Sequence, residues 1–482
     1  MSSEQTQEPG QRSDEGTESH DPAVPRAYAD FMRTGWGERP LDVQRHPVAD
    51  HAARRRKEIA SAFPGERLVV PAGGYKVRAN DTDYRFRPDT AHTWLCGNQT
   101  SDAVLVIEDG EAALYARPRS SRETDEFFRD RQYGELWAGR RPSLEEIGET
   151  LGITTRHLDD LPDVLRTRGS TRLLRGRDAR IDSLVRPEAT EARGVEADAE
   201  LARMLGEARL VKDDWELGEL KAACDATTLG FEDSVADWDN ALIHGERWIE
   251  GTFFRRARAM GNDLGYDSIV GGGQHATTLH WITNDGPLTP GEMVLLDMGV
   301  EATSLYTADV TRTLPVSGTY TPLQRELYSL VLAAQQAGID AVRPGVPFQA
   351  AHRAAMEVLA HALEDMGLLP VSAQEALDPD SRVYARWTLH GTSHMLGMDV
   401  HDCASSSPDA YPGGDLAEGM VLTVEPGLYF QADDLLVPEE LRGIGIRIED
   451  DIVVTADGSR NLSAALPRDP DEIESWMDGL RG

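Results

Sequence analysis

The sequence is poor in cysteine and contains no long apolar run. Its three cysteines among 482 residues, Cys96, Cys224 and Cys403, are odd in number and scattered, so they form neither a disulfide framework nor a structural zinc site. We therefore expect a reducing, cytoplasmic setting. No stretch approaches the ~20 consecutive apolar residues of a membrane-spanning helix. Residues 1–23 lack the apolar segment of a secretory signal, so we expect no membrane insertion or secretion.

Basic residues are also scarce relative to acidic ones. The 49 Lys and Arg residues face 83 Asp and Glu residues, which gives a formal net charge of −34. A nucleic-acid partner needs a basic face, and an anionic membrane surface would repel this chain. The remaining composition, with 40% hydrophobic and 27% charged residues, is that of a globular protein. The sequence therefore predicts a protein that binds neither nucleic acid nor membranes.

Sequence patterns divide the chain into a tail and two domains. Residues 1–24 are polar, and we expect them to be disordered. Residues 25–205 mix short apolar runs with helical patterns, which predicts a small α/β domain that ends in an acidic linker. Residues 206–482 form the second domain. The expected strands of the first domain are 66–72, 103–108, 111–118 and 178–184, and its expected helices are 50–62, 143–151 and 159–166.

The second domain shows helices followed by strands, twice over. This order predicts an α+β architecture rather than an alternating, doubly wound sheet. Thr321 and Pro322 suit a helix start, because Thr can cap the helix and Pro fits its first turn. The expected helices are 214–238, 252–259, 321–342 and 348–367, and the expected strands are 293–298, 305–314, 420–430 and 443–454.

Two aspartates lie within apolar strands. Asp297 closes the run Val-Leu-Leu, and Asp309 lies twelve positions later, between Ala308 and Val310. A carboxylate in such a strand is costly to bury unless it is paired or binds a cation. The short loop between the strands predicts an antiparallel hairpin that brings both carboxylates together, where a divalent metal would remove their repulsion. Either aspartate alone could instead cap a turn.

Two glutamates occur in the same kind of context. Glu425 follows Val-Leu-Thr-Val and precedes Pro-Gly, so it also needs a partner. Glu449 lies in an alternating strand and shares one face of it with Arg447. Taken alone, that segment is equally typical of a surface Arg–Glu pair on an edge strand. We expect Asp450 and Asp451 to take the solvated side of a turn.

Histidines cluster in the segment TLHGTSHMLGMDVHD. It contains His390, His394 and His401 among Gly, Ser and Thr residues, and His280 lies upstream. A single buried histidine is most often only hydrogen-bonded, but three among small residues favour metal ligation and acid–base roles. The small neighbours also let a substrate approach the backbone.

Four carboxylates and at least one imidazole form a hard, oxygen-rich donor set. It suits Mn, Co, Fe or Zn in a two-metal arrangement, and it lacks the thiolates of structural zinc sites. Two such ions lower the pKa of a bound water, and neighbouring histidines can hold the substrate carbonyl or the developing oxyanion. The predicted chemistry is metal-assisted hydrolysis, most simply of an amide. The sequence contains no Gly-x-Ser-x-Gly motif and no phosphate-binding loop.

These segments resemble the proline-specific branch of the pita-bread metallopeptidases, with the aminopeptidase P family nearest and prolidase next. The resemblance covers most of 205–465 and is carried by LLDMG, ADVTRTLPVSG, HGTSHMLGMDVHD, VLTVEPGLYF and GIGIRIEDDIVVT. It implies a duplicated α+β pita-bread catalytic domain after the smaller α/β domain. The implied substrate is a peptide with proline at its second position. Two divalent metal ions, most often manganese, and a homo-oligomer, either a dimer or a tetramer, are also implied.

The resemblance assigns roles to particular residues. The implied metal ligands are Asp297, Asp309, His394, Glu425 and Glu449. The implied catalytic residues are His280, His390, His401, Glu425 and Arg447. Asp309 and Glu449 would bridge both ions. His390 would polarise the scissile carbonyl, His401 would steady the tetrahedral intermediate, and Glu425 would also shuttle a proton.

The first domain resembles the aminopeptidase P N-terminal domain more weakly, through RANDTDYRFRPDTAHTWLCG, DAVLVI and ELWAGRR. Asp81 matches a position near the substrate amine, and Trp137 lies in a segment that reaches a neighbouring subunit's site in oligomeric relatives. Both are predicted substrate-binding residues. This domain favours an aminopeptidase over a prolidase that cuts only Xaa-Pro dipeptides. A non-catalytic scaffold and a metal-free creatinase-like enzyme are further alternatives, but such relatives lose metal ligands that this sequence retains.

Overall fold

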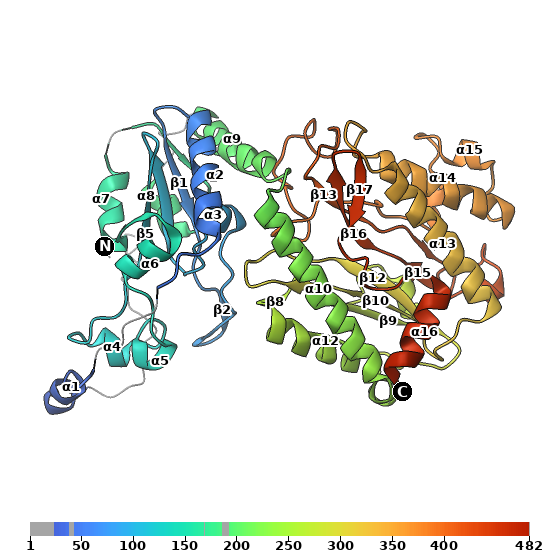
Figure 1. Cartoon of the computed structure of the whole chain (residues 1–482), viewed down its shortest axis with the longest axis horizontal. Coiled ribbons are helices and arrows are strands. Elements are labelled where there is room, and N and C mark those ends of the chain that lie inside the picture. Colours follow the sequence, from blue (N-terminus) through green and yellow to red (C-terminus); the bar gives the residue numbers. More distant parts are fainter. Residues whose placement is uncertain (1–23, 38–42, 168, 186–191, 482) are drawn as a thin grey trace, which may run out of the picture. The chain divides into compact units, whose positions relative to one another are not determined.

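The computed structural model describes residues 24–37, 43–167, 169–185 and 192–481. The predicted disordered tail lies outside these ranges except for its last residue. The chain folds into two compact units, which are unit 1, Met1–Asp198, and unit 2, Ala199–Gly482 (Figure 1). Within the described residues, no helix has the length and apolarity needed to span a membrane.

Unit 1 is built on a mixed five-stranded sheet in the order β6-β5-β4-β1-β7. Its central pairs are antiparallel, and β6 and β7 join the edges in parallel. The three strands predicted between 66 and 118 are therefore present. The strands are β1 Arg67–Pro71, β4 Val104–Glu108, β5 Glu111–Ala116, β6 Thr154–His157 and β7 Thr171–Leu173.

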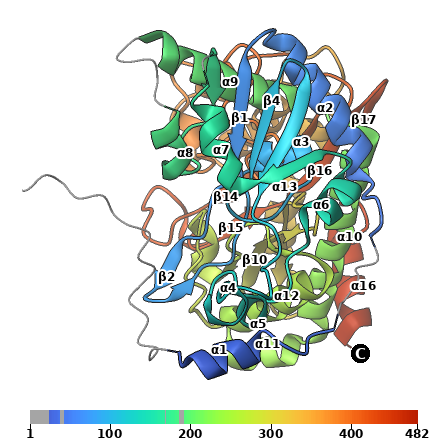
Figure 2. The ribbon, with the colours of Figure 1, turned by 90° about the vertical axis from the view of Figure 1, so that its left-hand side faces the viewer.

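Helices surround this sheet, and those predicted at 50–62, 143–151 and 159–166 are confirmed. Figure 2 shows α1, α4 and α5 together at one end of unit 1, apart from the sheet and beside the hairpin β2 Val77–Ala79 and β3 Thr82–Asp83. The helices are α1 Arg26–Met32, α2 Val48–Ala62, α3 Thr90–Cys96, α4 Glu126–Arg129, α5 Glu135–Ala138, α6 Leu144–Leu151, the 3-10 helix η1 Leu158–Asp160, α7 Leu161–Leu165 and α8 Ala179–Leu184.

The strand predicted at 178–184 is wrong, because this segment forms α8. The carboxylate of Asp178 accepts a hydrogen bond from the backbone N–H of Arg180 (2.9 Å) and caps the helix. Ile181 and Leu184 are spaced for one helix face, and Ile181 is buried in the core under the sheet. The helical period outweighs the short apolar alternation that suggested a strand.

The first half of unit 2 places helices before a small sheet. A capping box of Asp213 and Glu216 starts α10, and α10 packs against α12. The strands β9, β10 and β12 form an antiparallel sheet in the order β12-β10-β9. The elements are α9 Ala192–Ala208, which crosses the unit boundary, α10 Asp214–Ala236, α11 Trp238–His244, α12 Glu246–Met260, β8 Asp263–Leu264, β9 Ile269–Gly272, η2 Gly273–Thr277, β10 Met293–Met298, β11 Val300–Glu301 and β12 Val310–Pro315.

The second half repeats the order of helices and then strands. A capping box of Thr321 and Gln324 starts α13, as the Thr-Pro pair predicts, and α13 packs against α14. The strands form the sheets β13-β16-β17 and β14-β15. The elements are α13 Pro322–Ala341, α14 Ala350–Asp365, α15 Ala373–Ala376, η3 Val383–Arg386, β13 Val421–Val424, β14 Gly427–Tyr429, η4 Glu439–Leu441, β15 Gly445–Arg447, β16 Asp450–Thr455, β17 Gly458–Asn461 and α16 Pro470–Arg481.

Two predicted strands are shorter than expected, and a third, predicted at 443–454, is divided at Ile448 and Glu449 into β15 and β16. The strand predicted at 305–314 begins only at Val310, because Leu305 has a left-handed φ of 73° in a turn that precedes it. The strand predicted at 420–430 is interrupted at Glu425 and Pro426, since proline has no N–H to donate to a neighbouring strand. Both interruptions lie beside residues of the predicted metal site.

Asp450 and Asp451 contradict the expectation of a solvated turn, because both are fully buried. Asp450 accepts hydrogen bonds from Arg312 (2.8 Å) and Ser463 (2.7 Å). A buried guanidinium and a hydroxyl therefore offset the cost of burying the carboxylate of Asp450.

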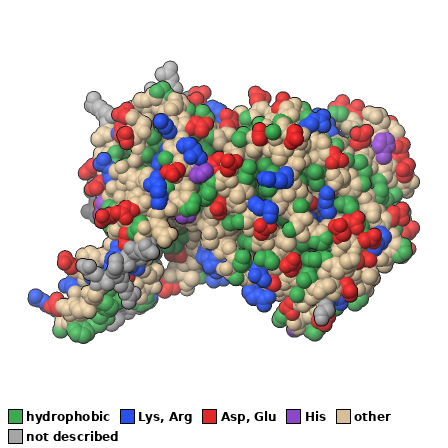
Figure 3. Space-filling view, viewed as in Figure 1, with side chains coloured by type: hydrophobic (Ala, Val, Ile, Leu, Met, Phe, Trp, Pro, Cys, Tyr) green, Lys and Arg blue, Asp and Glu red, His purple; other side chains and the backbone are tan. Residues whose placement is uncertain are grey.

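Charge is distributed unequally between the units. Unit 2 contains 19 basic and 47 acidic residues, a formal net charge of −28 within a chain of −34. Acidic side chains recur across its visible face (Figure 3). Unit 1 is close to balanced by comparison.

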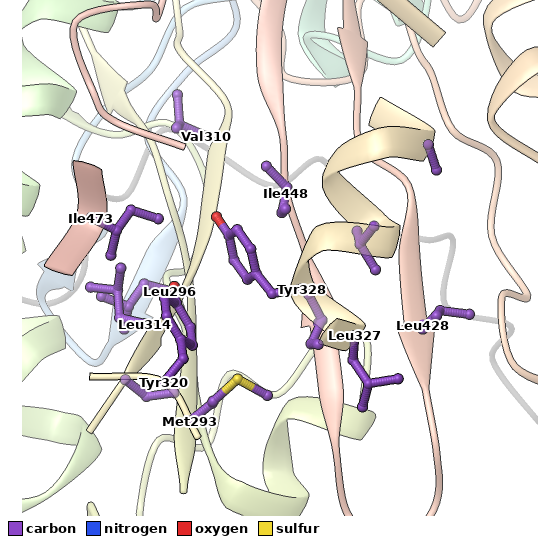
Figure 4. Packing of buried hydrophobic residues seen from close by; sticks show 14 of the residues in the cluster. Met293, Leu296, Val310, Leu314, Tyr320, Leu327, Tyr328, Leu428, Ile448 and Ile473 are labelled. Atoms are coloured by element: carbon purple, nitrogen blue, oxygen red, sulfur yellow. The ribbon is translucent and has the colours of Figure 1, made fainter. Parts of the chain in front are cut away.

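The largest apolar core joins the two halves of unit 2. Met293, Leu296 and Leu314 of the first sheet pack with Leu327 and Tyr328 of α13 in one buried cluster (Figure 4). The same cluster includes residues of β14 and α16. Burying these side chains stabilises each by roughly 1.5–3 kcal/mol relative to exposure. This shared core holds the strands that carry the acidic residues in fixed positions.

Candidate metal centre and active site

A cavity of about 500 Å³ in unit 2 collects every site residue that the sequence predicts in this half of the chain. β10 supplies Asp297, the turn before β12 supplies Asp309, and the break between β13 and β14 supplies Glu425. The cavity is lined by all nine predicted residues, His280, Asp297, Asp309, His390, His394, His401, Glu425, Arg447 and Glu449. Residues that are far apart in the sequence therefore converge on one space.

Three of the five predicted ligands meet closely enough to hold one cation. One ligand atom each from Asp309, His394 and Glu449 lies within 4.8 Å of the others. His394 Nε2 lies 3.3 Å from Asp309 Oδ2 and 3.6 Å from Glu425 Oε1. Glu425 therefore adjoins this group, although it is not one of the three.

Asp297 lies in the same cavity but binds other partners. Its Oδ1 accepts a hydrogen bond from the hydroxyl of Tyr266 and its Oδ2 from Arg447 Nη2, both at 2.6 Å. The guanidinium of Arg447 also donates to Thr311 Oγ1 (3.1 Å) and Tyr429 Oη (3.0 Å). The buried guanidinium thus holds the carboxylate at the edge of the group rather than within it.

The crowding of carboxylates has an electrostatic cost. Burial and the neighbouring charge of Asp309 hold the pKa of Glu449 well above its usual value. Burial raises the pKa of Glu425 to about 7 and also raises the pKa of Asp297. Burial alone would raise the pKa of Asp309, but hydrogen bonds to His394 and Tyr266 and the positive charges of His394 and Arg447 together lower it. A divalent cation removes this repulsion, so the donor set fits hard metal ions.

The imidazoles are held in different protonation states. Burial and then the charge of Arg447 lower the pKa of His390 to about 3, which keeps its ring neutral. His390 Nδ1 lies 2.8 Å from Gly391 O, which only accepts, so its Nε2 accepts the hydroxyl of Tyr429 at 2.7 Å. By contrast, burial alone would lower the pKa of His394, but its contacts with Asp309, Glu425 and Met395 O together raise it to about 9. The neutral ring suits a hydrogen-bonding role, and the basic ring suits a ligand.

His401 packs its ring against His394, with 4.3 Å between the ring centroids. Burial and then the neighbouring His394 lower the pKa of His401. His280 completes the histidines around the cavity. A substrate in the cavity therefore meets several imidazoles beside the carboxylates.

Sequence reasoning missed three hydrogen-bonding residues of this site. Tyr266 and Tyr429 position Asp297 and His390, and Thr311 Oγ1 donates to Glu449 Oε2 at 2.6 Å. Tyr429 carried a signal, because it alternates with Gly427 on a strand that follows Glu425. Tyr266 carried none, since it lies in an irregular loop between β8 and β9.

The two predicted substrate residues of unit 1 share a partner. Asp81 lies 3.5 Å from Arg131, and the guanidinium of Arg131 lies 5.2 Å from the ring centroid of Trp137. Both side chains are more than half exposed. They therefore form one exposed group on the β2–β3 hairpin and α5.

The duplicated α+β unit and its cluster of buried carboxylates and histidines define a metallopeptidase. Residues 219–456 match the family described as metallopeptidase family M24, and residues 51–173 match the aminopeptidase P N-terminal domain. The chain is 53% identical to Xaa-Pro aminopeptidase 1 of Streptomyces coelicolor, over 99% of this chain and 97% of that protein. It is 31% identical to human Xaa-Pro aminopeptidase 3, over 84% and 80% of the two chains.

Similar solved structures lead to the same family as the sequence comparisons. Aminopeptidase P from Escherichia coli with the inhibitor Pro-Leu has a TM-score of 0.77 and 28% identity, covering 89% of this chain and 98% of that one. Aminopeptidase PepP of Pseudomonas aeruginosa has a TM-score of 0.77 and 27% identity, covering 91% and 99%. The chain belongs to the aminopeptidase P family of metallopeptidases. The predicted α+β pita-bread fold and the metallo-exopeptidase class are thereby confirmed.

Proposed function

We propose that this chain removes the N-terminal residue of peptides whose second residue is proline, and that the cavity of unit 2 performs the hydrolysis. The observation that carries the proposal is the convergence of Asp309, His394 and Glu449, with Asp297 and Glu425 in the same cavity. The relatives with which it aligns along nearly its whole length are named Xaa-Pro aminopeptidases. A non-catalytic scaffold would have no use for buried carboxylates that repel one another.

The proposed ligands are the five residues of the sequence prediction, which together would hold two divalent ions. When bound, such ions supply a nucleophilic water and stabilise negative charge on the carbonyl oxygen. Glu425 has a pKa of about 7, so it can both accept and release a proton near neutral pH. Its Oε2 lies 3.4 Å from His390 Nδ1, which places this proton beside the substrate-facing histidines.

The histidines and the arginine prepare the rest of the site. The neutral ring of His390 adds no charge to the cavity and would hold the substrate by exchanging its bond to Gly391 O or to Tyr429, and His280 and His401 face the same cavity. Arg447 fixes Asp297 and Tyr429 together. Apolar walls suit the ring of proline, and they are formed by Ile269, Leu279, Ile282 and Val400.

Further parts of the proposal concern the cell and the assembly. Manganese is the metal we favour, since the donors are mainly oxygen atoms, although Co, Zn and Fe suit the same set. The three cysteines are free and buried, which supports a cytoplasmic setting.

Asp81 and Trp137 would contact substrate in a homo-oligomer, a dimer or a tetramer, where exposed unit 1 residues can reach a second copy. Sedimentation velocity tests the assembly, and a strictly monomeric active enzyme would contradict it.

The function is tested by stripping the metal and adding Mn²⁺, Co²⁺ or Zn²⁺ stepwise, with an Xaa-Pro-Xaa tripeptide and mass spectrometry. We expect release of the first residue only after metal is restored. Asp309→Asn should lower kcat/KM by at least ~100-fold, because metal-ion catalysis supplies several kcal/mol. The exposed Asp433→Asn is the matched control and should keep wild-type activity. Absence of cleavage with every metal would refute the proposal.

A prolidase is the second candidate, because the same fold serves both activities. It would cleave an Xaa-Pro dipeptide and leave the tripeptide intact. We expect the opposite preference, since the match to the aminopeptidase P N-terminal domain favours longer peptides. Comparing the two substrates at one metal concentration decides between them.

A further inference from the structure

Asp451 is a buried carboxylate that does not line the cavity. Its Oδ2 accepts the backbone N–H of Asp309 at 3.1 Å and the thiol of Cys224 at 3.2 Å. Its Oδ1 is also buried and has no hydrogen-bond partner among the described residues. A buried carboxylate that is satisfied on one side only is costly, so its contacts with Asp309 and Cys224 call for an explanation.

The position of Asp451 in β16 gives one. Glu449 directly precedes β16 and Asp451 lies within it, and both side chains approach Asp309. Glu449 offers its carboxylate to the group with Asp309, and Asp451 holds the main chain of Asp309. Thr311 lies in β12, two residues after Asp309. Its backbone O accepts the backbone N–H of Glu449 at 3.1 Å, and the Thr311 hydroxyl donates to Glu449 Oε2. Asp451 therefore holds the backbone of Asp309, and Thr311 holds Glu449, so the segments that carry these two ligands are fixed to each other.

Cys224 links this contact to a third element. It lies on α10, is fully buried, and uses its thiol as a donor to Asp451. The N–H of Asp309, in the turn that precedes β12, donates to this carboxylate, whereas the neighbouring Ala308 N–H donates to Val300 O. The carboxylate of Asp309 can be presented accurately only if its backbone is held.

We propose that Asp451, oriented by the thiol of Cys224, is a positioning residue that presents Asp309 for metal binding. The inference rests on the proposed role of Asp309 as a ligand. Removing a hydrogen-bond partner of a metal ligand typically weakens metal affinity by roughly 10- to 100-fold. Asp451→Ala should therefore weaken Mn²⁺ binding by that factor, whereas Asp451→Asn keeps an oxygen that accepts the Asp309 N–H and should stay within about threefold of wild type.

The test is calorimetric titration of Mn²⁺ alone into the metal-stripped full chain, with thermal unfolding of the same samples. Cys224→Ala should weaken binding and Cys224→Ser should restore it, because a hydroxyl keeps the donor. The control Val453→Ala removes a buried side chain from the same strand and should lower stability without changing Mn²⁺ affinity. If Asp451→Ala does not fold, the Cys224 pair decides the question.

Two outcomes overturn the inference. The first is wild-type Mn²⁺ affinity in folded Asp451→Ala or in Cys224→Ala. The second is equal loss in Asp451→Asn and Asp451→Ala, which would mean that charge rather than the hydrogen bond matters. If Asp309→Asn itself binds Mn²⁺ like wild type, the ligand assignment fails, and with it the proposed function. Loss in Asp309→Asn with retention in Asp451→Ala refutes the positioning role alone.

Discussion

Arg447 shows how a single residue organises the charges of the cavity. Arg447 is 3% exposed, and its guanidinium contacts Asp297, Tyr429 and Thr311. A surface Arg–Glu pair on an edge strand is the alternative interpretation of this segment, but Glu449 is also only 1% exposed. A buried cation among carboxylates is strongly destabilising to remove, because its partners remain uncompensated. The pair belongs to the site rather than to the surface.

Metal binding should release protons in a pH-dependent way. In the metal-free protein the pKa of His394 is about 9 and that of Glu425 about 7, so at pH 7 the imidazole carries a proton and the carboxyl is half protonated. Ligands bind metal in their deprotonated forms. Mn²⁺ affinity should therefore rise with pH up to about 9, by roughly tenfold per unit for each displaced proton.

Calorimetry in two buffers of different ionisation enthalpy measures these protons directly. More than one proton should be released per site at pH 7, because His394 and Glu425 hold protons there and Glu449 and Asp297 also have raised pKa values, and fewer should be released above pH 9. Mn²⁺ affinity that stays constant between pH 6 and pH 9 would contradict the assignment of His394 and Glu425 as ligands.

Most of the site could be predicted because its polar residues occur in stretches of sequence where such residues are unusual. Asp297 and Glu425 are acids in apolar strands, and the histidine cluster stands among small residues. Asp450 and Asp451 were predicted wrongly as solvated, because β16 is buried on both of its faces and a run of acids gives no sign of that. Tyr266 could not be found, because the loop geometry that brings it to Asp297 depends on tertiary packing.

At the scale of elements, α13 contributes Leu327 and Tyr328 to the core that both halves of unit 2 share. It begins where the sequence predicts, because Thr321 and Gln324 satisfy each other's backbone N–H groups. Long amphipathic helices such as this one and α10 were predictable from their period. The short segment that became α8 was not, since a single turn of helix and a short strand can share one apolar pattern.

Thr321→Ala should lower the free energy of unfolding of unit 2 by about 1 kcal/mol, because the N-cap hydrogen bond is lost. Thr319→Ala, the same substitution at an exposed position two residues earlier, should change it by less than about 0.5 kcal/mol. Urea unfolding midpoints of the metal-loaded proteins compare the two. Equal midpoints for both variants would show that the capping box does not stabilise α13.

The whole molecule combines an acidic catalytic unit with a nearly balanced first unit. With a net charge of −28, unit 2 creates a negative potential around its cavity. Such a field attracts cationic peptides and repels anionic ones over distances of about one Debye length. The charge therefore bears on the choice among peptides that share proline at the second position.

At low ionic strength, kcat/KM should favour Gly-Pro-Arg over Gly-Pro-Glu, and salt should reduce the difference. Raising the ionic strength to ~0.5 M should remove a preference on the order of 3- to 10-fold. Gly-Pro-Gln serves as the neutral control and should change little. If the ratio of kcat/KM for the two charged peptides did not change with salt, local contacts rather than the field would set the preference.

The convergence of Asp309 with Glu449 has a consequence for the synthesis of the protein. The ribosome releases Asp297 and Asp309 long before it releases Glu449, and the cavity needs strands from both ends of this stretch. A partly synthesised chain therefore has no catalytic power. Hydrolysis can therefore begin only after the segment that carries Glu449 has left the ribosome and joined the earlier strands.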